Sequence, residues 1–193
     1  MSFAGLCLDR NFCGTHWSDA WQRRVYRKSN VWLTLVEIVN VCTMVKLVEM
    51  PPASYDKWKA QIWKSYREEM IRAGTSEAAA DENIQENIRE LMPDGKLTPG
   101  NFVFDVMKAE DHVGYVWLNE KNSEWFIYDI EVFEKYRGRG FGRETMQAIE
   151  AHIRAKGGNV IGLSVFGFNK VAQKLYEAEG YEVTRLSMQK KLN

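Results

Sequence analysis

A loop at residues 137–142, with the sequence Arg-Gly-Arg-Gly-Phe-Gly, constrains the fold of this chain more than any other segment. It follows a run of β-branched and aromatic residues at 125–132 and precedes a helical pattern, so it joins a strand to a helix. Glycine accepts a positive φ and lets a ligand approach the backbone closely. The first turn of a helix adds unpaired N–H groups and a partial positive charge. We therefore expect an anion site here, suited to a phosphate or pyrophosphate.

The surroundings of this loop are basic, although the whole chain is neutral. Lys plus Arg and Asp plus Glu both total 26. Residues 134–143 nevertheless contain four basic side chains and one acidic side chain, a local charge of +3. The neutral total argues against a nucleic-acid-binding protein, which usually has a basic excess. It is compatible with a local site for an anion.

Two common phosphate-binding loops are excluded by particular residues. A Walker loop needs Gly-Lys followed by Ser or Thr, and the sequence contains no such triplet. A dinucleotide-binding fold needs Gly-x-Gly-x-x-Gly and an acid at the end of the next strand. Here the spacing is Gly-x-Gly-x-Gly, and the next apolar run ends Ser164-Val165-Phe166.

The pattern along the chain predicts one mixed α/β domain with an N-terminal extension. With 193 residues, 45% hydrophobic and 27% charged, the composition is that of a packed domain. Residues 1–43 show no clear periodicity, whereas residues 44–193 follow the order β-α-α-β-β-β-α-β-α-β. The predicted strands are 45–49, 102–108, 113–119, 125–132, 160–166 and 181–192. The predicted helices begin at Ser54, at Thr75 or Ser76, after the glycine loop, and at Asn169.

Two elements of this sequence resemble the GNAT superfamily of acetyl-CoA-dependent N-acetyltransferases. The family loop Arg/Gln-x-x-Gly-x-Gly/Ala matches at Arg137, Gly140 and Gly142. The second element, an Asn at a helix start followed by Ala-x-x-Leu-Tyr-Glu and Gly-Tyr, matches residues 169–181. The resemblance covers about residues 44–193 and is greatest to small bacterial stand-alone members. It implies a GNAT fold, with a mostly antiparallel central sheet and helices on both faces.

The resemblance also implies a site for acetyl-CoA as co-substrate. Pyrophosphate binding would fall to Arg137 at the loop entry and to the amides of Gly138, Arg139, Gly140, Phe141, Gly142 and Arg143. Backbone groups of Ile130, Glu131 and Val132 would bind the pantetheine arm as a strand does. The amide of Val132 would polarise the acetyl carbonyl. Asn169 would hold the other side of the arm.

The implied reaction is direct transfer of the acetyl group to a primary amine. The amine must lose a proton to attack, and the leaving thiolate must gain one. Tyr176 matches the general acid of the family; its alternative interpretation is a buried core aromatic beside Leu175. The base is left open between carboxylates of one strand. Asp129 is favoured, then Glu124, with Glu131 on the same face as Asp129.

The acceptor is expected to be a small-molecule or peptide amine, and homodimerisation is left open. The alternative function is a non-catalytic CoA-binding sensor or interaction module on the same fold. No membrane span is expected, because Glu37, Asn40 and Lys46 interrupt the apolar stretch at 31–48.

The cysteines indicate a reducing, cytoplasmic location. They are three, at positions 7, 13 and 42, which is no disulfide framework. Cys7, Cys13 and His16 lack a second ligand pair at a zinc-like spacing, so no metal is expected. Residues 1–43 have no counterpart in the family, and we expect either a poorly ordered extension or an artefact of start-codon choice. The intact mass of the native protein would decide between them.

Overall fold

The computed structural model describes residues 25–28, 31–34, 44–190 and 192. The chain divides into two compact units, Met1–Met44 and Val45–Asn193. In the first unit, β1 (Val25–Lys28) pairs with β2 (Val31–Thr34) as an antiparallel hairpin, which the sequence analysis did not predict. The three cysteines and His16 lie outside the described residues, and so does most of the segment 1–43 on whose order an expectation was stated.

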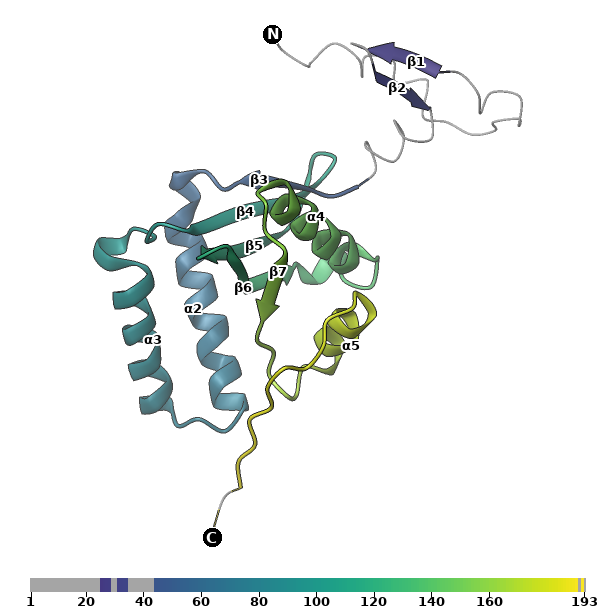
Figure 1. The fold of residues 1–193 in the computed structure, drawn as a ribbon. Helices are drawn as coiled ribbons and strands as arrows, with labels where there is room; N and C mark the ends of the chain where they lie inside the picture. Colours follow the sequence, from purple (N-terminus) through teal and green to yellow (C-terminus); the bar gives the residue numbers. More distant parts are fainter. Residues whose placement is uncertain (1–24, 29–30, 35–43, 191, 193) are drawn as a thin grey trace. The chain divides into compact units, whose positions relative to one another are not determined.

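The second unit is built on a five-stranded sheet in the order β3-β4-β5-β6-β7 (Figure 1). The strands are β3 (Lys46–Glu49), β4 (Asn101–Lys108), β5 (Asp111–Lys121), β6 (Glu124–Val132) and β7 (Val160–Leu163). All neighbours are antiparallel except β6 and β7, which are parallel. A parallel pair needs a crossover connection, and the glycine loop with its helix supplies it. The prediction of a mixed α/β fold with a mostly antiparallel sheet is confirmed.

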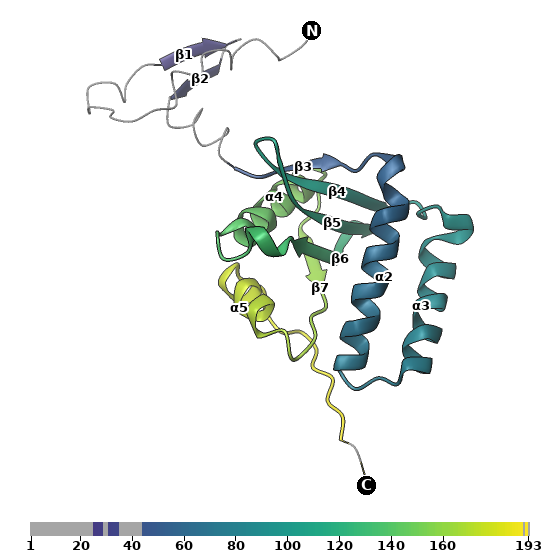
Figure 2. The ribbon, with the colours of Figure 1, turned by 180° about the vertical axis from the view of Figure 1, so that it is seen from behind.

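Helices cover both faces of this sheet, as predicted (Figures 1 and 2). On one face lie α2 (Tyr55–Arg72) and α3 (Glu77–Leu91). On the other lie α4 (Phe141–Ala155) and α5 (Lys170–Ala178). Short 3-10 turns occupy Pro52–Ser54, Pro93–Gly95 and Glu134–Tyr136.

Two of the predicted helix caps form, and one does not. Ser76 accepts a hydrogen bond from the amide of Ala79 at 3.3 Å, and Asn169 accepts one from Ala172 at 3.1 Å. Ser54 precedes α2 but its side chain caps nothing. The 3-10 turn has already given Ser54 φ −90° and ψ −12°, whereas a capping residue needs an extended backbone.

Each face of the sheet has its own hydrophobic core. Val116 and Leu118 of β5 are fully buried against Met146 and Ile149 of α4. On the opposite face, Trp58 of α2 packs edge-on against Trp117 with ring centroids 5.3 Å apart. A buried side chain of this size stabilises the fold by about 1.5–3 kcal/mol. The two cores fix the sheet between its helices and so position the strand ends.

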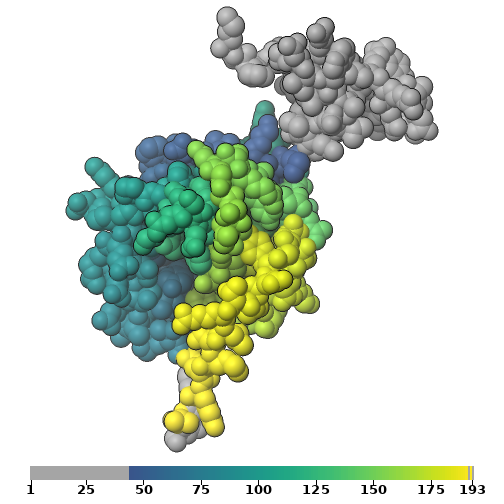
Figure 3. Space-filling view, viewed as in Figure 1, coloured from purple at the N-terminus to yellow at the C-terminus, as the bar shows by residue number. Residues whose placement is uncertain are grey.

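The predicted last strand at 181–192 is wrong over the described residues, since 181–190 and 192 form no strand. Leu186 and Met188 are 76% and 86% exposed, and the segment, in yellow, runs along the surface (Figure 3). The predicted strand 160–166 is shorter than expected and ends at Leu163. Strand propensity mostly reports packing against a neighbouring strand, and neither residues 164–166 nor the described part of 181–192 has one in this sheet.

Candidate active site

A β-bulge in β6 determines the direction of Asp129. Leu118 of β5 pairs with Ile127, but Trp117 pairs with Asp129, so Tyr128 is an extra residue. A bulge turns the side chains that follow it to the other face. Without it, Asp129 would share the face of Ile127, which belongs to the core beneath α4. With it, Asp129 shares the face of Trp117, toward α2.

The strands β6 and β7 are paired over four residues only. Glu124–Ile127 pair with Val160–Leu163, and β6 then continues to Val132 alone on that side. The amide of Phe133 donates to the Val113 carbonyl of β5 at 2.9 Å. Because peptide groups alternate in direction, those of Val132 and Ile130 face the unpaired side. An extended ligand can add to such an edge as a strand would.

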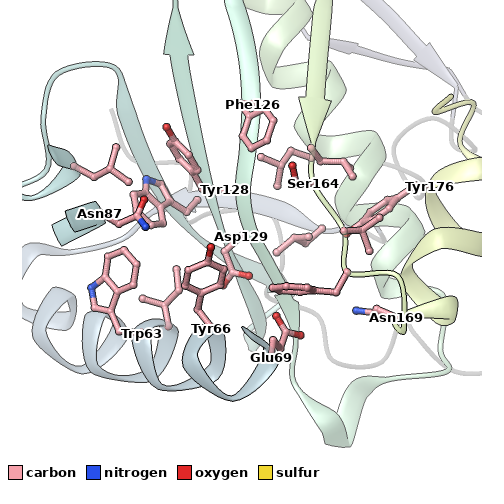
Figure 4. Close-up of a pocket in the computed structure, with 18 residues that line it drawn as sticks. Trp63, Tyr66, Glu69, Asn87, Phe126, Tyr128, Asp129, Ser164, Asn169 and Tyr176 are labelled. Atoms are coloured by element: carbon pink, nitrogen blue, oxygen red, sulfur yellow. The ribbon is translucent and has the colours of Figure 1, made fainter. Parts of the chain in front are cut away.

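A pocket of about 450 Å³ lies where these strands separate (Figure 4). The helices α2 and α3, the strands β5 and β6, the segment after β7, and α5 all contribute to its lining. Among the predicted site residues, Asp129, Ile130, Asn169 and Tyr176 line it. Asn169 uses its side-chain oxygen to cap α5, so its side-chain N–H₂ group remains for a ligand.

Asp129 titrates near neutral pH. Burial raises the pKa of its carboxyl group to about 7, and the negative charges of Glu131 and Glu69 add to this effect. The Tyr115 hydroxyl and the Ile130 amide oppose the rise in pKa, because they stabilise the ionised form. A group with this pKa can take up and release a proton at physiological pH, which is what a general base needs.

Tyr176 and Glu69 adjoin Asp129 from two other elements. Burial raises the pKa of Tyr176 to about 12, with the charges of Asp129 and Glu69 adding to the rise. The hydroxyl is therefore protonated at neutral pH and able to donate. Burial also raises the pKa of Glu69; Arg72 opposes this and Glu131 adds to it. Tyr176 lines the pocket and also packs against the α4-side core, while its role as the general acid stays a prediction.

The glycine loop leaves its amides free for a ligand. Gly138 and Gly140 have φ values of 74° and 83°, and Gly140 is the N-cap of α4 without a side-chain cap. The first backbone hydrogen bond of α4 is donated by the Glu144 amide to the Gly140 carbonyl, at 3.1 Å. The amides of residues 141–143 are thus left at the positive end of the helix dipole. At Gly142 an added Cβ would lie 3.1 Å from the Leu175 side chain, so this glycine lets α4 and α5 approach.

The arginines of the loop have different roles. Arg137 donates to the Val132 carbonyl at 2.8 Å and lies 3.6 Å from the Glu131 carboxylate, which ties the loop to β6. Arg143 pairs with Glu179 at 2.6 Å. Arg139 is exposed beside the Tyr136 ring, with 5.9 Å from its guanidinium to the ring centroid. Of these three, Arg139 is the side chain most available to an anion.

Two predicted residues are placed differently from the rest. Glu124 is exposed at the first position of β6 and does not line the pocket. It lies about 16 Å along the strand from Asp129, at about 3.3 Å per residue, so the structure does not bring it to the site. The ring of Phe141 packs against Tyr136, with centroids 6.0 Å apart, so only its backbone faces the loop.

Glu69 and Tyr115 are site residues that sequence reasoning did not assign. Ile62, Tyr66 and Glu69 follow each other at helical spacing, which places Glu69 on the inward face of α2. That spacing was a usable signal for Glu69. Tyr115 follows the alternation of β5, but only the register with β6 brings it to Glu131 and Asp129.

Among the described residues, no three His, Cys, Asp or Glu side chains are grouped so as to hold a metal ion. Within the same residues, no helix has the length and apolar character that crossing a bilayer requires.

The sequence model of the Acetyltransferase (GNAT) family matches residues 59–181. This chain belongs to the GNAT family. The match includes both elements on which the resemblance was based, the glycine loop and the Asn169 helix. It also includes all but the first turn of α2 and the whole of α3, which form one side of the pocket.

Relatives of this GNAT protein are named as acetyltransferases. It is 30% identical to the uncharacterized N-acetyltransferase YycN of Bacillus subtilis over 154 residues, 77% of this chain and 99% of YycN. It is 24% identical to the uncharacterized N-acetyltransferase YdgE of the same organism over 152 residues, 76% of this chain and 97% of YdgE.

Solved structures that are similar to this chain are also named as acetyltransferases. The crystal structure of YycN superposes with a TM-score of 0.72, covering 77% of this chain and 99% of YycN. A proposed acetyl transferase from Pyrococcus furiosus has a TM-score of 0.52 at 25% identity, covering 77% of this chain and 99% of that chain. The GNAT protein described here is an acetyltransferase enzyme.

Proposed function

We propose that this enzyme moves an acetyl group from acetyl-CoA directly to a primary amine bound in the pocket. The proposal rests on one observation, the placement of Asp129. Its carboxyl group titrates near neutral pH, and it lies in the same pocket as Tyr176, beside the unpaired edge of β6. Acyl transfer to an amine needs a base and an acid at one reacting centre, and this pair supplies both.

Donor binding is assigned to backbone groups. The free amides of residues 141–143 and the exposed Arg139 suit the pyrophosphate. The Ile130 carbonyl, on the unpaired side of β6, suits an amide N–H of the pantetheine arm. Arg137 already occupies the Val132 carbonyl, so the amide N–H of Val132 is the group left to polarise the acetyl oxygen.

The proposed reaction then follows from the two titratable groups. Asp129 accepts the proton of the amine, whose nitrogen attacks the thioester carbon. The new C–N bond forms as the C–S bond breaks, and the thiolate of CoA leaves with the electron pair of that bond. Tyr176 donates its proton to the thiolate and regains one from the nitrogen of the new amide, which still carries a second proton to lose. Asp129 releases the proton that it accepted to solvent. The products are the acetylated amine and free CoA.

The alternative of a non-catalytic CoA-binding module predicts binding without turnover. The shared pocket of Asp129 and Tyr176 favours catalysis, because neither group is needed for binding by backbone amides.

Acetyl-CoA binding is tested by thermal unfolding. At one hundred times its Kd, a ligand stabilises the native state by about 2.7 kcal/mol. For a protein of this size that corresponds to a rise in Tm of about 5–10 °C. Gly140→Val should abolish the rise, because a β-branched residue is strained at φ 83° and the loop must distort.

Gly157→Val is the matched control. Gly157 also has a positive φ, 84°, and open space around its Cβ position, but it lies at the other end of α4. This variant should unfold at a lower temperature than the parent yet keep the rise with acetyl-CoA. If both variants lost the rise in Tm with acetyl-CoA equally, the assignment of the glycine loop to acetyl-CoA binding would be contradicted. Release of free CoA thiol over a panel of amines tests the reaction, and binding without release from any amine would favour the binding module.

A further inference from the structure

A continuous series of aromatic rings lines one side of the pocket. Neighbouring ring centroids in this aromatic belt lie between 4.8 and 6.4 Å apart. Its members, in spatial order, are Phe126, Tyr128, Trp117, Trp63, Tyr66 and Phe166. All six line the pocket, and they come from α2, β5, β6 and the segment after β7. Such a wall favours an apolar body, and its ring faces also attract cations.

The charge of the pocket has one sign. Glu69 and Asp129 line it, and its described lining contains no Lys or Arg. Nearby basic groups are already engaged elsewhere. Arg72 lies over the Phe168 ring, 4.3 Å from its centroid, and Arg137 is tied to Val132 and Glu131. The pocket therefore offers charged partners to a cation and no charged partner to a carboxylate.

Hydrogen-bonding groups on the belt side are few. The Asn87 side-chain nitrogen donates to the backbone and side-chain oxygens of Asn83 at 2.8 and 2.9 Å, so it is engaged within α3. The hydroxyls of Tyr66, Tyr128 and Ser164 and the side-chain oxygen of Asn87 remain. An acceptor with many hydroxyl groups would leave most of them without partners when it is desolvated here.

We propose that the acceptor is a small cationic primary amine on an apolar, preferably aromatic, body that carries no carboxylate. The inference rests on the proposed function, because it names the substrate class of that same site. Figure 4 sets Trp63, Tyr66 and Tyr128 on one side of Asp129, and Asn169 and Tyr176 on the other.

The amine nitrogen would lie at Asp129, where the two sides meet. Its apolar body would point away from the donor side and toward the belt, with the ammonium group held by the two acids before it loses its proton. A carboxylate on the same body would lie close to both acids without a counter-charge, which disfavours binding strongly.

The decisive experiment compares phenethylamine, L-phenylalanine and L-phenylalanine amide as acceptors. Each compound has one aromatic ring and one primary amine. On the carbon that bears the amine, L-phenylalanine carries a charged carboxylate, its amide carries a neutral carboxamide, and phenethylamine carries only hydrogen. We expect phenethylamine and the amide to exceed L-phenylalanine in kcat/KM by about tenfold or more. Ethanolamine, which lacks the apolar body, should also have a lower kcat/KM than phenethylamine.

Tyr128 allows a matched pair of variants, since its side chain is 41% exposed and its removal opens no core cavity. Tyr128→Ala should raise the KM for phenethylamine about threefold to tenfold, the usual worth of one aromatic contact, and leave the KM for acetyl-CoA unchanged. Tyr128→Phe should keep the parent value, because it retains the ring.

Calorimetry separates this inference from the proposed function. Phenethylamine should bind the enzyme more tightly than 3-phenylpropionate, which has a similar body with the opposite charge. Equal kcat/KM for L-phenylalanine and its amide, or for ethanolamine and phenethylamine, would overturn the substrate class and leave amine acetylation standing. Preferential binding of phenethylamine with no turnover of any amine would instead overturn the proposed function alone.

Discussion

Replacing Asp129 with asparagine is expected to make the protein more stable and much less active. Asparagine keeps the shape of the side chain and can still accept a hydrogen bond from the Tyr115 hydroxyl. It carries no charge and cannot accept a proton from the amine. Loss of a general base typically slows a reaction by about 10²–10⁴-fold. The same substitution removes a carboxylate whose ionised form is disfavoured by burial.

The gain in stability follows from the pKa. Burial raises the pKa of Asp129 from 3.8 to about 7. The unfolded chain therefore loses this proton at a lower pH than the folded protein does. Ionisation destabilises the fold increasingly from about pH 4 to pH 7 and to a constant extent above that. At 1.36 kcal/mol for each tenfold difference, the limit is about 4 kcal/mol, and the amide, which is also desolvated, recovers at most that amount.

Urea unfolding of parent and variant at pH 8 and pH 5 measures this effect. The free energy of unfolding that the variant gains over the parent should be about 2–3 kcal/mol larger at pH 8 than at pH 5. At pH 5 the folded parent still holds the proton of Asp129, so it avoids most of the cost of a buried charge. Glu124→Gln is the control, since it makes the same change at an exposed site and should alter neither stability nor rate. An Asp129→Asn variant with equal gains at both pH values, or with a rate within threefold of the parent, would refute the reasoning.

Three further outcomes are expected. The kcat/KM of the parent should rise about tenfold between pH 6 and pH 8, as Asp129 ionises with a pKa of about 7, and a flat profile would remove it as the base. Tyr176→Phe should lower kcat while keeping the rise in Tm with acetyl-CoA; an unchanged kcat would end its role as the acid. Gly158→Ala should destabilise the protein by about 1–3 kcal/mol in thermal unfolding, because the new methyl group would lie 2.6 Å from Ile153 Cγ2.

Structural features that depend only on residues close together in the chain could be predicted from the sequence. Ser76 and Asn169 cap amides three residues away, so the helix starts could be placed from composition alone. The same holds for Gly140, whose positive φ is a local requirement at the start of α4. Ser54 shows the limit of this approach, because the turn before it changed its backbone conformation.

Features that depend on contacts between distant parts of the chain could not be predicted from local sequence. The pKa of Asp129 depends on burial and on the charge of Glu69, which belongs to a helix far away in the sequence. The tail at 181–192 has the composition of a strand, yet pairing requires a partner that its sequence does not specify. For the same reason the pocket and its aromatic belt emerge only from the structure, since they combine residues of several elements.

The bulge in β6 means that the pairing of this strand with β5, and not the sequence of β6 alone, decides which face carries the reactive carboxylate. Deleting Tyr128 would make the pairs Leu118–Ile127 and Trp117–Asp129 consecutive, so Asp129 would keep the face of Trp117. Regular pairing with Tyr128 retained would instead set Tyr128 opposite Trp117 and turn Asp129 toward the core beneath α4. A descendant of this protein can therefore lose the bulge residue and keep the carboxylate at the pocket, whereas a slip of the pairing by one residue would remove it without any change in sequence.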